Sequence, residues 1–145
     1  MKKLFSVYAA TLALVGCSSI QNTPIPEPEA KVVSNPSRVS HMVFFGWDSA
    51  ELPPNIADIL SPHVMYLLNH PDQKLLIEGA ADETGDEQYN YELGMSRANQ
   101  VKRAFQAKGI ASHQLIVRSI GINRPLNHQN NAQAFSRNRR AMLVY

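Results

Sequence analysis

The chain of 145 residues has a single cysteine, Cys17, so no disulfide can form within it. It also lacks a long apolar run, because the stretch from Leu4 to Val15 is too short to span a bilayer. No Gly-x-Ser-x-Gly motif, phosphate-binding loop or catalytic cysteine is present. These absences argue against the common hydrolases and nucleotide-binding enzymes. We therefore expect a protein that is not an enzyme and needs no cofactor.

The first residues are typical of a secretion signal. Lys2 and Lys3 are followed by the short apolar run, which ends in Leu-Val-Gly-Cys at positions 14–17. This ending resembles the cleavage box of bacterial lipoproteins, in which the new N-terminal cysteine, here Cys17, carries the acyl chains, palmitate among them. Ser18 rather than Asp after the cysteine favours the outer membrane. The alternative is a plain signal peptide with an incidental cysteine.

Amino-acid composition divides the chain into three segments. Residues 1–16 are expected to be a signal peptide, and residues 17–40, polar and containing four prolines, a tether behind the lipidated cysteine. Residues 41–145 are long enough for one domain with its own core. Two of the fourteen basic residues lie in the signal, which leaves twelve basic against twelve acidic residues. This neutral balance, together with export, argues against nucleic acid as a partner.

Charges are nevertheless segregated along the chain. Residues 78–92 contain six acids and no base, whereas residues 93–145 contain nine bases and no acid. Such a division suits a zwitterionic ligand or internal pairing. The basic run at 137–140 precedes a terminal strand, where structural pairing is favoured. The acidic cluster lacks the alternation of a calcium-binding EF-hand loop. We expect no metal site, since the histidines lack zinc-ligand spacing and are expected at the surface or in turns: His41, His63, His70, His113 and His128.

Hydrophobic periodicity predicts an α+β domain with the order β-α-β-α-β-(α)-β, its helices packed on one face of a mixed four-stranded sheet. Strands are expected at 42–47, 74–79, 115–120 and 140–145. Helices are expected from Pro53-Pro54 to residue 68, from residue 86 or 87 to 108, and briefly at 132–137. Pro62 should kink or restart the first helix. Asp86 can cap the second helix, although Thr84 with Glu87 offers a capping box, and Gly109 should end it.

One charge in the second helix stands out. At helical spacing Arg97 falls on the same stripe as Tyr89, Leu93, Val101 and Phe105. A guanidinium on a core-facing stripe is costly unless something pairs with it. Asp82, just after the preceding strand, is the nearest candidate partner. Such a pair can fix the loop to the helix, or it can receive a ligand that carries both an amine and a carboxylate.

The ordered motifs resemble the OmpA C-terminal-like domain family, and most closely its peptidoglycan-associated lipoproteins. The resemblance covers residues 41–145. It rests on Val-Phe-Phe-Gly-Trp-Asp at 43–48, on Leu-Ile-Glu-Gly at 76–79 with Asp82, Glu83 and Gly85, on the Tyr-Asn, Leu-Gly and Arg-Ala pairs of the second helix, and on Asn-Arg-Arg-Ala at 138–141. It implies an outer-membrane lipoprotein whose periplasmic domain binds peptidoglycan non-covalently through the diaminopimelate of the stem peptide.

The resemblance also implies roles for single residues. Arg97 would take the free carboxylate of diaminopimelate in a two-pronged hydrogen bond, and Asp82 would take its ammonium. The further positions at the ligand are Asn90, Phe45, Gly46, Ala81 and, as a weaker contact, Arg139. The family also contacts a periplasmic protein of the Tol system, which adds a possible partner.

This chain departs from the family's pattern at several positions. Ala80-Ala81 stands where His-Thr is usual, Gly46 replaces a common acidic residue, and Thr84 stands where arginine is frequent. The loss of about three hydrogen bonds predicts binding weakened roughly a hundredfold. The alternative function is therefore a periplasmic adaptor, similar to proteins of the Tol system, whose peptidoglycan site is weakened or lost. Trp47 is expected in the core or in the wall of the site.

Overall fold

The computed structural model describes residues 39–145. The expected signal peptide, the lipidation site at Cys17 and nearly all of the tether lie outside the described residues. The elements follow the order β1 (Met42–Phe44), α1 (Ile56–Asn69), β2 (Leu75–Ala80), α2 (Glu87–Ala107), the short 3-10 helix η2 (Ser112–Gln114), β3 (Leu115–Gly121), α3 (Ala132–Asn138) and β4 (Arg140–Val144). The predicted element order is confirmed, and only η2 was not expected.

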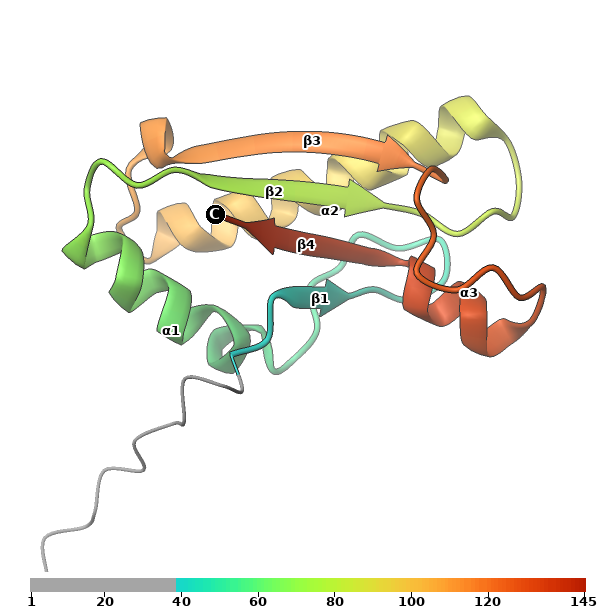
Figure 1. Cartoon of the computed structure of the whole chain (residues 1–145), viewed down its shortest axis with the longest axis horizontal. Coiled ribbons are helices and arrows are strands. Elements are labelled where there is room, and N and C mark those ends of the chain that lie inside the picture. Colours follow the sequence, from blue (N-terminus) through green and yellow to red (C-terminus); the bar gives the residue numbers. More distant parts are fainter. Residues whose placement is uncertain (1–38) are drawn as a thin grey trace, which may run out of the picture. The chain divides into compact units, whose positions relative to one another are not determined.

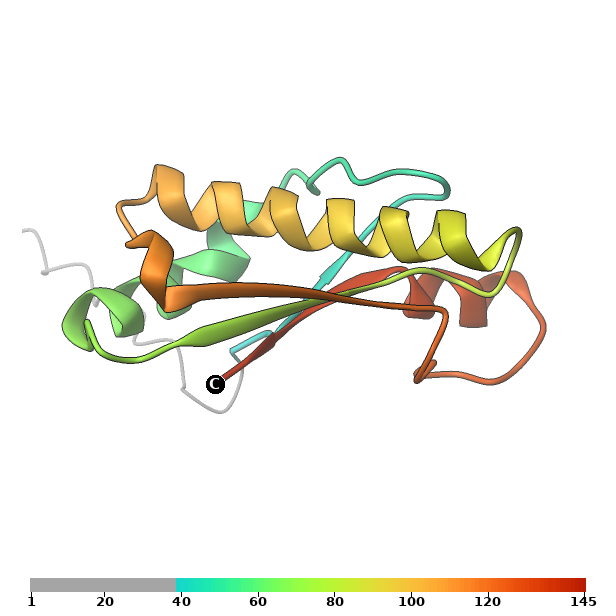
Figure 2. The same ribbon diagram turned by 90° about the horizontal axis from the view of Figure 1, so that it is seen from above.

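The strands form one mixed sheet in the order β1-β4-β2-β3. β2 and β3 are parallel, whereas β4 runs antiparallel to both β1 and β2. Figure 1 looks onto the sheet with α2 behind it, and Figure 2 shows α2 lying along that one face. α3 lies at the end of the sheet where β4 begins. The predicted α+β class and mixed four-stranded sheet are therefore confirmed.

The core lies between the sheet and the two longer helices. Alternate strand residues point inward, as the two-residue period of a strand requires. They meet the apolar side chains of α1 and α2 in one cluster of buried residues: Val43, Phe45, Leu60, Leu67, Leu75, Ile77, Ala98, Val101, Phe105, Ile110, Leu115, Ala141 and Leu143. None of the helices within residues 39–145 has the length and apolar character needed to cross a membrane.

Two glycines bring β2 and α2 into backbone contact. A Cβ atom added at Gly79 would lie 1.9 Å from the carbonyl oxygen of Gly94, and one added at Gly94 would lie 2.5 Å from the Ser119 hydroxyl. Only glycine allows such an approach. The loop that leaves β2 therefore begins directly beside the first turns of α2. This closeness places Asp82 and Arg97 in the same region although fifteen residues separate them.

The ends of α2 follow their sequence signals. The Asp86 carboxylate accepts a hydrogen bond from the Tyr89 N–H at 2.9 Å, so Asp86 rather than Thr84 is the cap. Gly109 has a φ of 89°, the left-handed conformation that ends many helices. The predicted stripe is right at Arg97, Val101 and Phe105, which are buried. It is wrong at Tyr89, which is half exposed, because the buried face at this end of the helix contains Asn90 and Gly94 instead.

Helix α1 differs from its prediction in two ways. It does not restart at Pro62 but runs as one helix through it, because buried Leu60 and Leu67 hold both sides of the proline against the core while only one backbone bond is lost. His63 is buried rather than exposed, with 2% of its surface accessible. Its ring nitrogens contact the Tyr145 hydroxyl at 2.8 Å and the Ser40 carbonyl at 3.0 Å. A buried imidazole needs such partners.

Strand β1 ends three residues earlier than predicted. The chain turns after Phe45, whose N–H donates to the Arg139 carbonyl at 3.0 Å. Asp48 then has a φ of 48°, a left-handed conformation that cannot continue a strand. Trp47 is carried outward by this turn and is 74% exposed, so it is not a core residue.

Candidate functional site

A cleft of about 290 Å³ opens between the loop after β1, the loop after β2 and the start of α2. Its lining includes four of the predicted site residues, Ala81, Asp82, Asn90 and Arg97. Phe45, Gly46 and Arg139 are not among the lining residues, but each contacts Arg97 or Asp82. The structure thus brings the acid and the base of the predicted site to one concave surface.

Arg97 is completely buried on α2. Its guanidinium donates to three backbone carbonyls, from Nε to Ser49 at 2.8 Å, from Nη1 to Ala80 at 2.9 Å and from Nη2 to Gly46 at 3.1 Å. It also lies over the Phe45 ring, 5.4 Å from the centroid. The prediction that Asp82 is its direct partner is wrong, because the turn after β1 and the end of β2 supply carbonyls closer at hand.

This anchoring leaves part of the guanidinium for other partners. An arginine has five N–H groups, so one N–H remains on each terminal nitrogen after the three bonds are made. Because Arg97 lines the cleft, these N–H groups can serve a carboxylate bound there. Burial is the largest influence on Arg97 and lowers its pKa to about 10, against the opposing effect of the nearby Asp82 charge. The group therefore stays charged at neutral pH.

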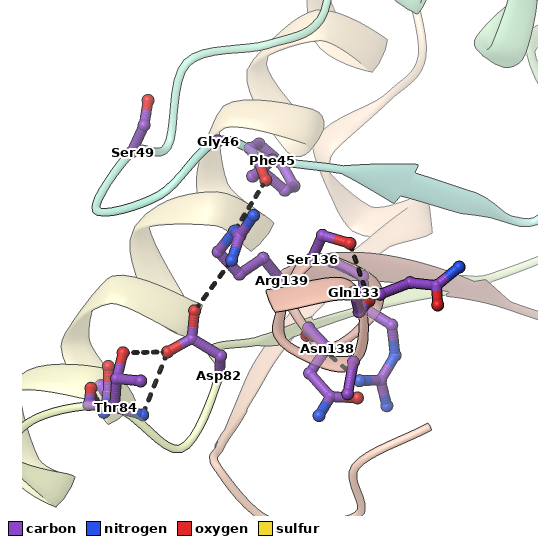
Figure 3. A network of polar contacts seen from close by, with 12 residues as sticks. Phe45, Gly46, Ser49, Asp82, Thr84, Gln133, Ser136, Asn138 and Arg139 are labelled. Carbon is purple, nitrogen blue, oxygen red and sulfur yellow. Dashed lines mark hydrogen bonds and ion pairs between the residues drawn. The ribbon is translucent and has the colours of Figure 1, made fainter. Parts of the chain in front are cut away.

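Asp82 forms its ion pair with Arg139, as Figure 3 shows. The Oδ2 atom accepts from Nη1 of Arg139 at 3.1 Å, and Oδ1 accepts from both the N–H and the hydroxyl of Thr84. The Nε of Arg139 donates to the Phe45 carbonyl at 3.2 Å. Burial by itself would raise the pKa of Asp82, but the bonds from Thr84 and the charge of Arg139 outweigh it and lower the pKa. Asp82 is therefore ionised well below neutral pH.

The remaining predicted residues support the loop after β2. Asn90 is buried and donates from Nδ2 to the Thr84 carbonyl at 2.9 Å. Ala81 is also buried, and its N–H donates to the Gly121 carbonyl at 2.8 Å. Gly46 and Ala80 both bind Arg97 through their backbone carbonyls, which any residue at these positions would offer. The hydroxyl missing at position 81 has a counterpart in Thr84, which bonds to Asp82.

Sequence reasoning missed part of the cleft wall. Trp47, which had been placed in the core or the site wall, lies in the wall, and Asp48 lies beside it. Tyr89 and Leu93, predicted on the core stripe, line the cleft as well. The Tyr89 hydroxyl donates to Oδ1 of Asp48 at 2.5 Å across the mouth of the cleft. An acid directly after an aromatic residue at the end of the apolar run, as in Trp47-Asp48, is the signal that could indicate this edge.

The segregated charges pair with one another inside the domain. Glu78, buried on β2, accepts from Arg118 on β3 and from Arg124 at 2.7 Å. Together with the pair of Asp82 and Arg139, this joins the acidic segment to the basic half. Within residues 39–145, no three histidine, cysteine, aspartate or glutamate side chains gather as metal ligands would.

Comparison with known proteins identifies the family. The model described as the OmpA family matches residues 44–139. The peptidoglycan-associated lipoprotein of Haemophilus influenzae is 33% identical over 148 residues, which cover 99% of this chain and 97% of the relative. The protein of that name from Pasteurella multocida is 37% identical over 103 residues, covering 71% of this chain and 69% of the relative.

Solved structures agree with this assignment. The crystal structure of the peptidoglycan-associated lipoprotein from Burkholderia pseudomallei superimposes with a TM-score of 0.71 at 35% identity, covering 73% of this chain and 90% of that one. The C-terminal domain of Helicobacter pylori MotB shares the fold, with a TM-score of 0.64 at 19% identity over 71% of this chain and 81% of that one. The chain belongs to the OmpA family.

Proposed function

We propose that this chain is an outer-membrane lipoprotein that binds peptidoglycan non-covalently through the diaminopimelate of the stem peptide and thereby links the outer membrane to the cell wall. The observation that carries the proposal is the cleft, which is lined by both Asp82 and Arg97. Relatives that match most of the chain are named peptidoglycan-associated lipoproteins, which supports the same function. Those names describe an association and no reaction, in keeping with a binding module rather than an enzyme.

The free end of diaminopimelate in a stem peptide carries an ammonium and a carboxylate. The two unused N–H groups of Arg97 suit the carboxylate. The start of α2 adds N–H groups that favour a negative charge nearby. The two aspartates and two arginines at the site, Asp48, Asp82, Arg97 and Arg139, sum to no net charge. A site of balanced charge with separated poles suits a zwitterion.

The remaining parts of the proposal concern the N-terminal residues and a protein partner. Residues 1–16 would be removed as a signal peptide, Cys17 would be acylated, and the tether of residues 17–40 would let the domain of residues 41–145 reach the wall from the membrane. A periplasmic protein of the Tol system is a further proposed partner. The alternative, an adaptor with a lost site, is less well supported because the cleft retains its charged residues and their hydrogen bonds.

Pelleting with isolated sacculi tests the function. The full-length chain in detergent is centrifuged with sacculi, alongside Asp82→Asn, Arg97→Gln and the control Asp58→Asn, which changes an exposed acid on α1. We expect the parent and the control to pellet, and the two site variants to lose binding by about tenfold or more. Circular dichroism checks that each variant is folded. A folded parent that stays in the supernatant would refute the proposal.

A labelled-lipid experiment tests the anchor separately. Cells that express the chain are grown with radioactive palmitate, and the protein is immunoprecipitated. We expect label in the parent and none in Cys17→Ser, with the parent fractionating with the outer membrane. An unlabelled parent would refute lipidation without bearing on the cleft.

A further inference from the structure

One face of the sheet is covered by α2, and the opposite face, called the open face here, is not. Figure 1 looks onto the open face, with α3 only at its end, and Figure 2 shows α2 along the other side. Strand residues alternate between the two faces, so the neighbours of the core residues point to the open face. The strand register places four of them in one row across the sheet, in the order Met42, Met142, Glu78 and Arg118.

Apolar side chains occupy much of the open face. Leu76 on β2 pairs with Ile116 on β3 and with Val144 on β4. Ile116 is 46% exposed and Phe44 on β1 is 45% exposed, unlike the core residues of the covered face. The apolar patch of the open face consists of Met42, Phe44, Leu76, Ile116, Met142 and Val144. A contiguous exposed apolar patch on a folded domain is typical of an interaction surface.

A cluster of arginines lies beside this patch. The Glu78 carboxylate accepts hydrogen bonds from Arg118 and, at 2.7 Å, from Arg124. The Glu78 side chain is 2% exposed, whereas those of Arg118 and Arg124 are 52% and 62% exposed. Burial alone would raise the pKa of Glu78, but the hydrogen bonds and charges of the two arginines outweigh it and lower the pKa. Arg140, buried nearby, donates to the Arg124 carbonyl at 2.9 Å. Three arginines against one carboxylate leave an excess of two positive charges.

The two exposed arginines keep N–H groups for an outside partner. Arg118 donates to Glu78 from Nε and Nη2, and Arg124 donates to it from Nη2 alone. A guanidinium has five N–H groups, so each arginine retains its Nη1 pair, a good donor to phosphate oxygens. Of the strand residues that point to the open face, only the buried Glu78 is acidic, and the segment between β3 and α3 contains no acid. The exposed charge on this face is therefore of one sign.

This combination of charge and apolar surface favours one occupant. A second copy of the chain would bring arginines against arginines, which is repulsive. A bilayer with anionic headgroups instead offers phosphates to the arginines and an apolar boundary to the patch. The proposed anchor at Cys17 lies 22 residues before Val39, so it would keep the domain within roughly 70 Å of a membrane. Such tethering raises the local concentration of the surface to be bound.

We propose that the open face docks on the anionic lipid surface of the membrane that anchors the chain, with Arg118 and Arg124 at the lipid phosphates and the apolar patch at the acyl boundary. The inference rests on the lipid anchor of the proposed function and is independent of the cleft. The first turns of α2 form one wall of the cleft, and α2 covers the opposite face of the sheet. A docked domain would therefore leave the cleft free for the cell wall.

Spin labelling in reconstituted vesicles tests the docking. Cys17 is the only cysteine, and acylation consumes its thiol, so Val144→Cys provides the only free thiol for a nitroxide label. The lipidated full-length protein is placed in vesicles of phosphatidylethanolamine with phosphatidylglycerol, or of phosphatidylcholine alone. Electron paramagnetic resonance compares collisions of the label with oxygen, which concentrates in lipid, and with a water-soluble nickel complex. Arg103→Cys, at an exposed position on α2, is the control label.

We expect the label at position 144 to contact lipid in the anionic vesicles and water in the neutral ones, and the label at position 103 to contact water in both. Salt at about 0.5 M should release the domain, because it screens exposed charges. Arg124→Gln should weaken docking about fivefold, as the loss of one arginine near an anionic surface implies, while Arg124→Lys should retain it. Ile116→Glu should abolish docking without touching an ion pair. Melting curves check the fold, since Arg118 still pairs with Glu78 in all three variants.

The outcomes separate the docking from the anchor. If the anchored chain shows equal water contact at positions 144 and 103 in anionic vesicles, the docking is refuted while the lipid anchor stands. Equal lipid contact in neutral vesicles would refute the role of the arginines and with it the proposal. If position 144 is covered only after soluble periplasmic protein is added, the occupant is a protein and the lipid assignment is wrong. A chain that does not remain with the vesicles would refute the anchor as well, whereas pelleting with sacculi tests the cleft independently.

Discussion

Arg97 is expected to stabilise the domain as well as to bind ligand. Its three hydrogen bonds join α2 to the carbonyls of Gly46, Ser49 and Ala80, so one side chain connects three segments. In Arg97→Gln the shorter amide can reach one carbonyl at most. Two of the carbonyls then lose their partners, at about 1–3 kcal/mol for a buried group such as Ala80 and less for the more exposed Gly46 and Ser49. Removal of a buried charge offsets part of this cost.

We therefore expect Arg97→Gln to lower the free energy of unfolding by about 2–4 kcal/mol, the net of these two effects. For a domain of this size, that corresponds to a fall of roughly 10–25 °C in Tm. Urea unfolding followed by far-ultraviolet circular dichroism measures the change. The matched control is Arg103→Gln, an exposed arginine on the same helix, which should change stability by less than about 0.5 kcal/mol.

The opposite result would be informative. A loss of less than about 1 kcal/mol in Arg97→Gln, with an unchanged slope against urea, would mean that the three carbonyls find other partners. The three carbonyls would then not be what holds the Arg97 guanidinium in position for a ligand. Arg97→Lys should also be destabilised, since a lysine ammonium does not match three carbonyls that surround a planar fork.

Three further predictions concern the scaffold. Gly79→Ala should lower stability by about 1–3 kcal/mol in urea unfolding, because the new methyl group meets the Gly94 backbone; unchanged stability would contradict the close contact. Asp86→Ala should cost about 0.5–2 kcal/mol through the lost cap at Tyr89, whereas Asp86→Asn should cost much less, and equal losses would contradict capping. The pKa of His63 is lowered, mainly by burial. The unfolded chain thus takes up a proton at a higher pH than the folded one, so stability should be fully present above about pH 6.5 and fall as the pH drops towards 5. His63→Gln should flatten that part of the melting-temperature profile, and an unaltered profile would refute the assignment.

The order of elements could be predicted because each element carries a local signal. Asp86 and Gly109 mark the ends of α2, and the turn residues at 69–72 mark the start of the apolar run that becomes β2. The length of β1 could not be predicted in the same way. Its apolar run continues to Trp47, but the left-handed turn at Asp48 ends the strand. A single backbone torsion leaves little trace in the pattern of apolar residues.

The candidate site was predictable only in part. A buried charge on a helix demands partners, so Arg97 could be recognised from its spacing alone. Which partners it finds depends on where chain segments 17 and about 50 residues away leave their carbonyls. Backbone carbonyls are the same in every residue, so no sequence pattern reports them. The pairing of Asp82 with Arg139 likewise joins positions 57 residues apart in the sequence.

Periodicity and turn residues are local features, so they predict the α+β domain, the burial of Arg97 and the nearness of Asp82 without the tertiary structure. The tertiary structure alone decided the distribution of hydrogen bonds among the charged groups. It paired Asp82 with Thr84 and Arg139, anchored Arg97 on three carbonyls, and joined Asp48 to the Tyr89 hydroxyl. The physical reason is that electrostatic partners are chosen by distances of about 3 Å in space, which sequence spacing does not specify.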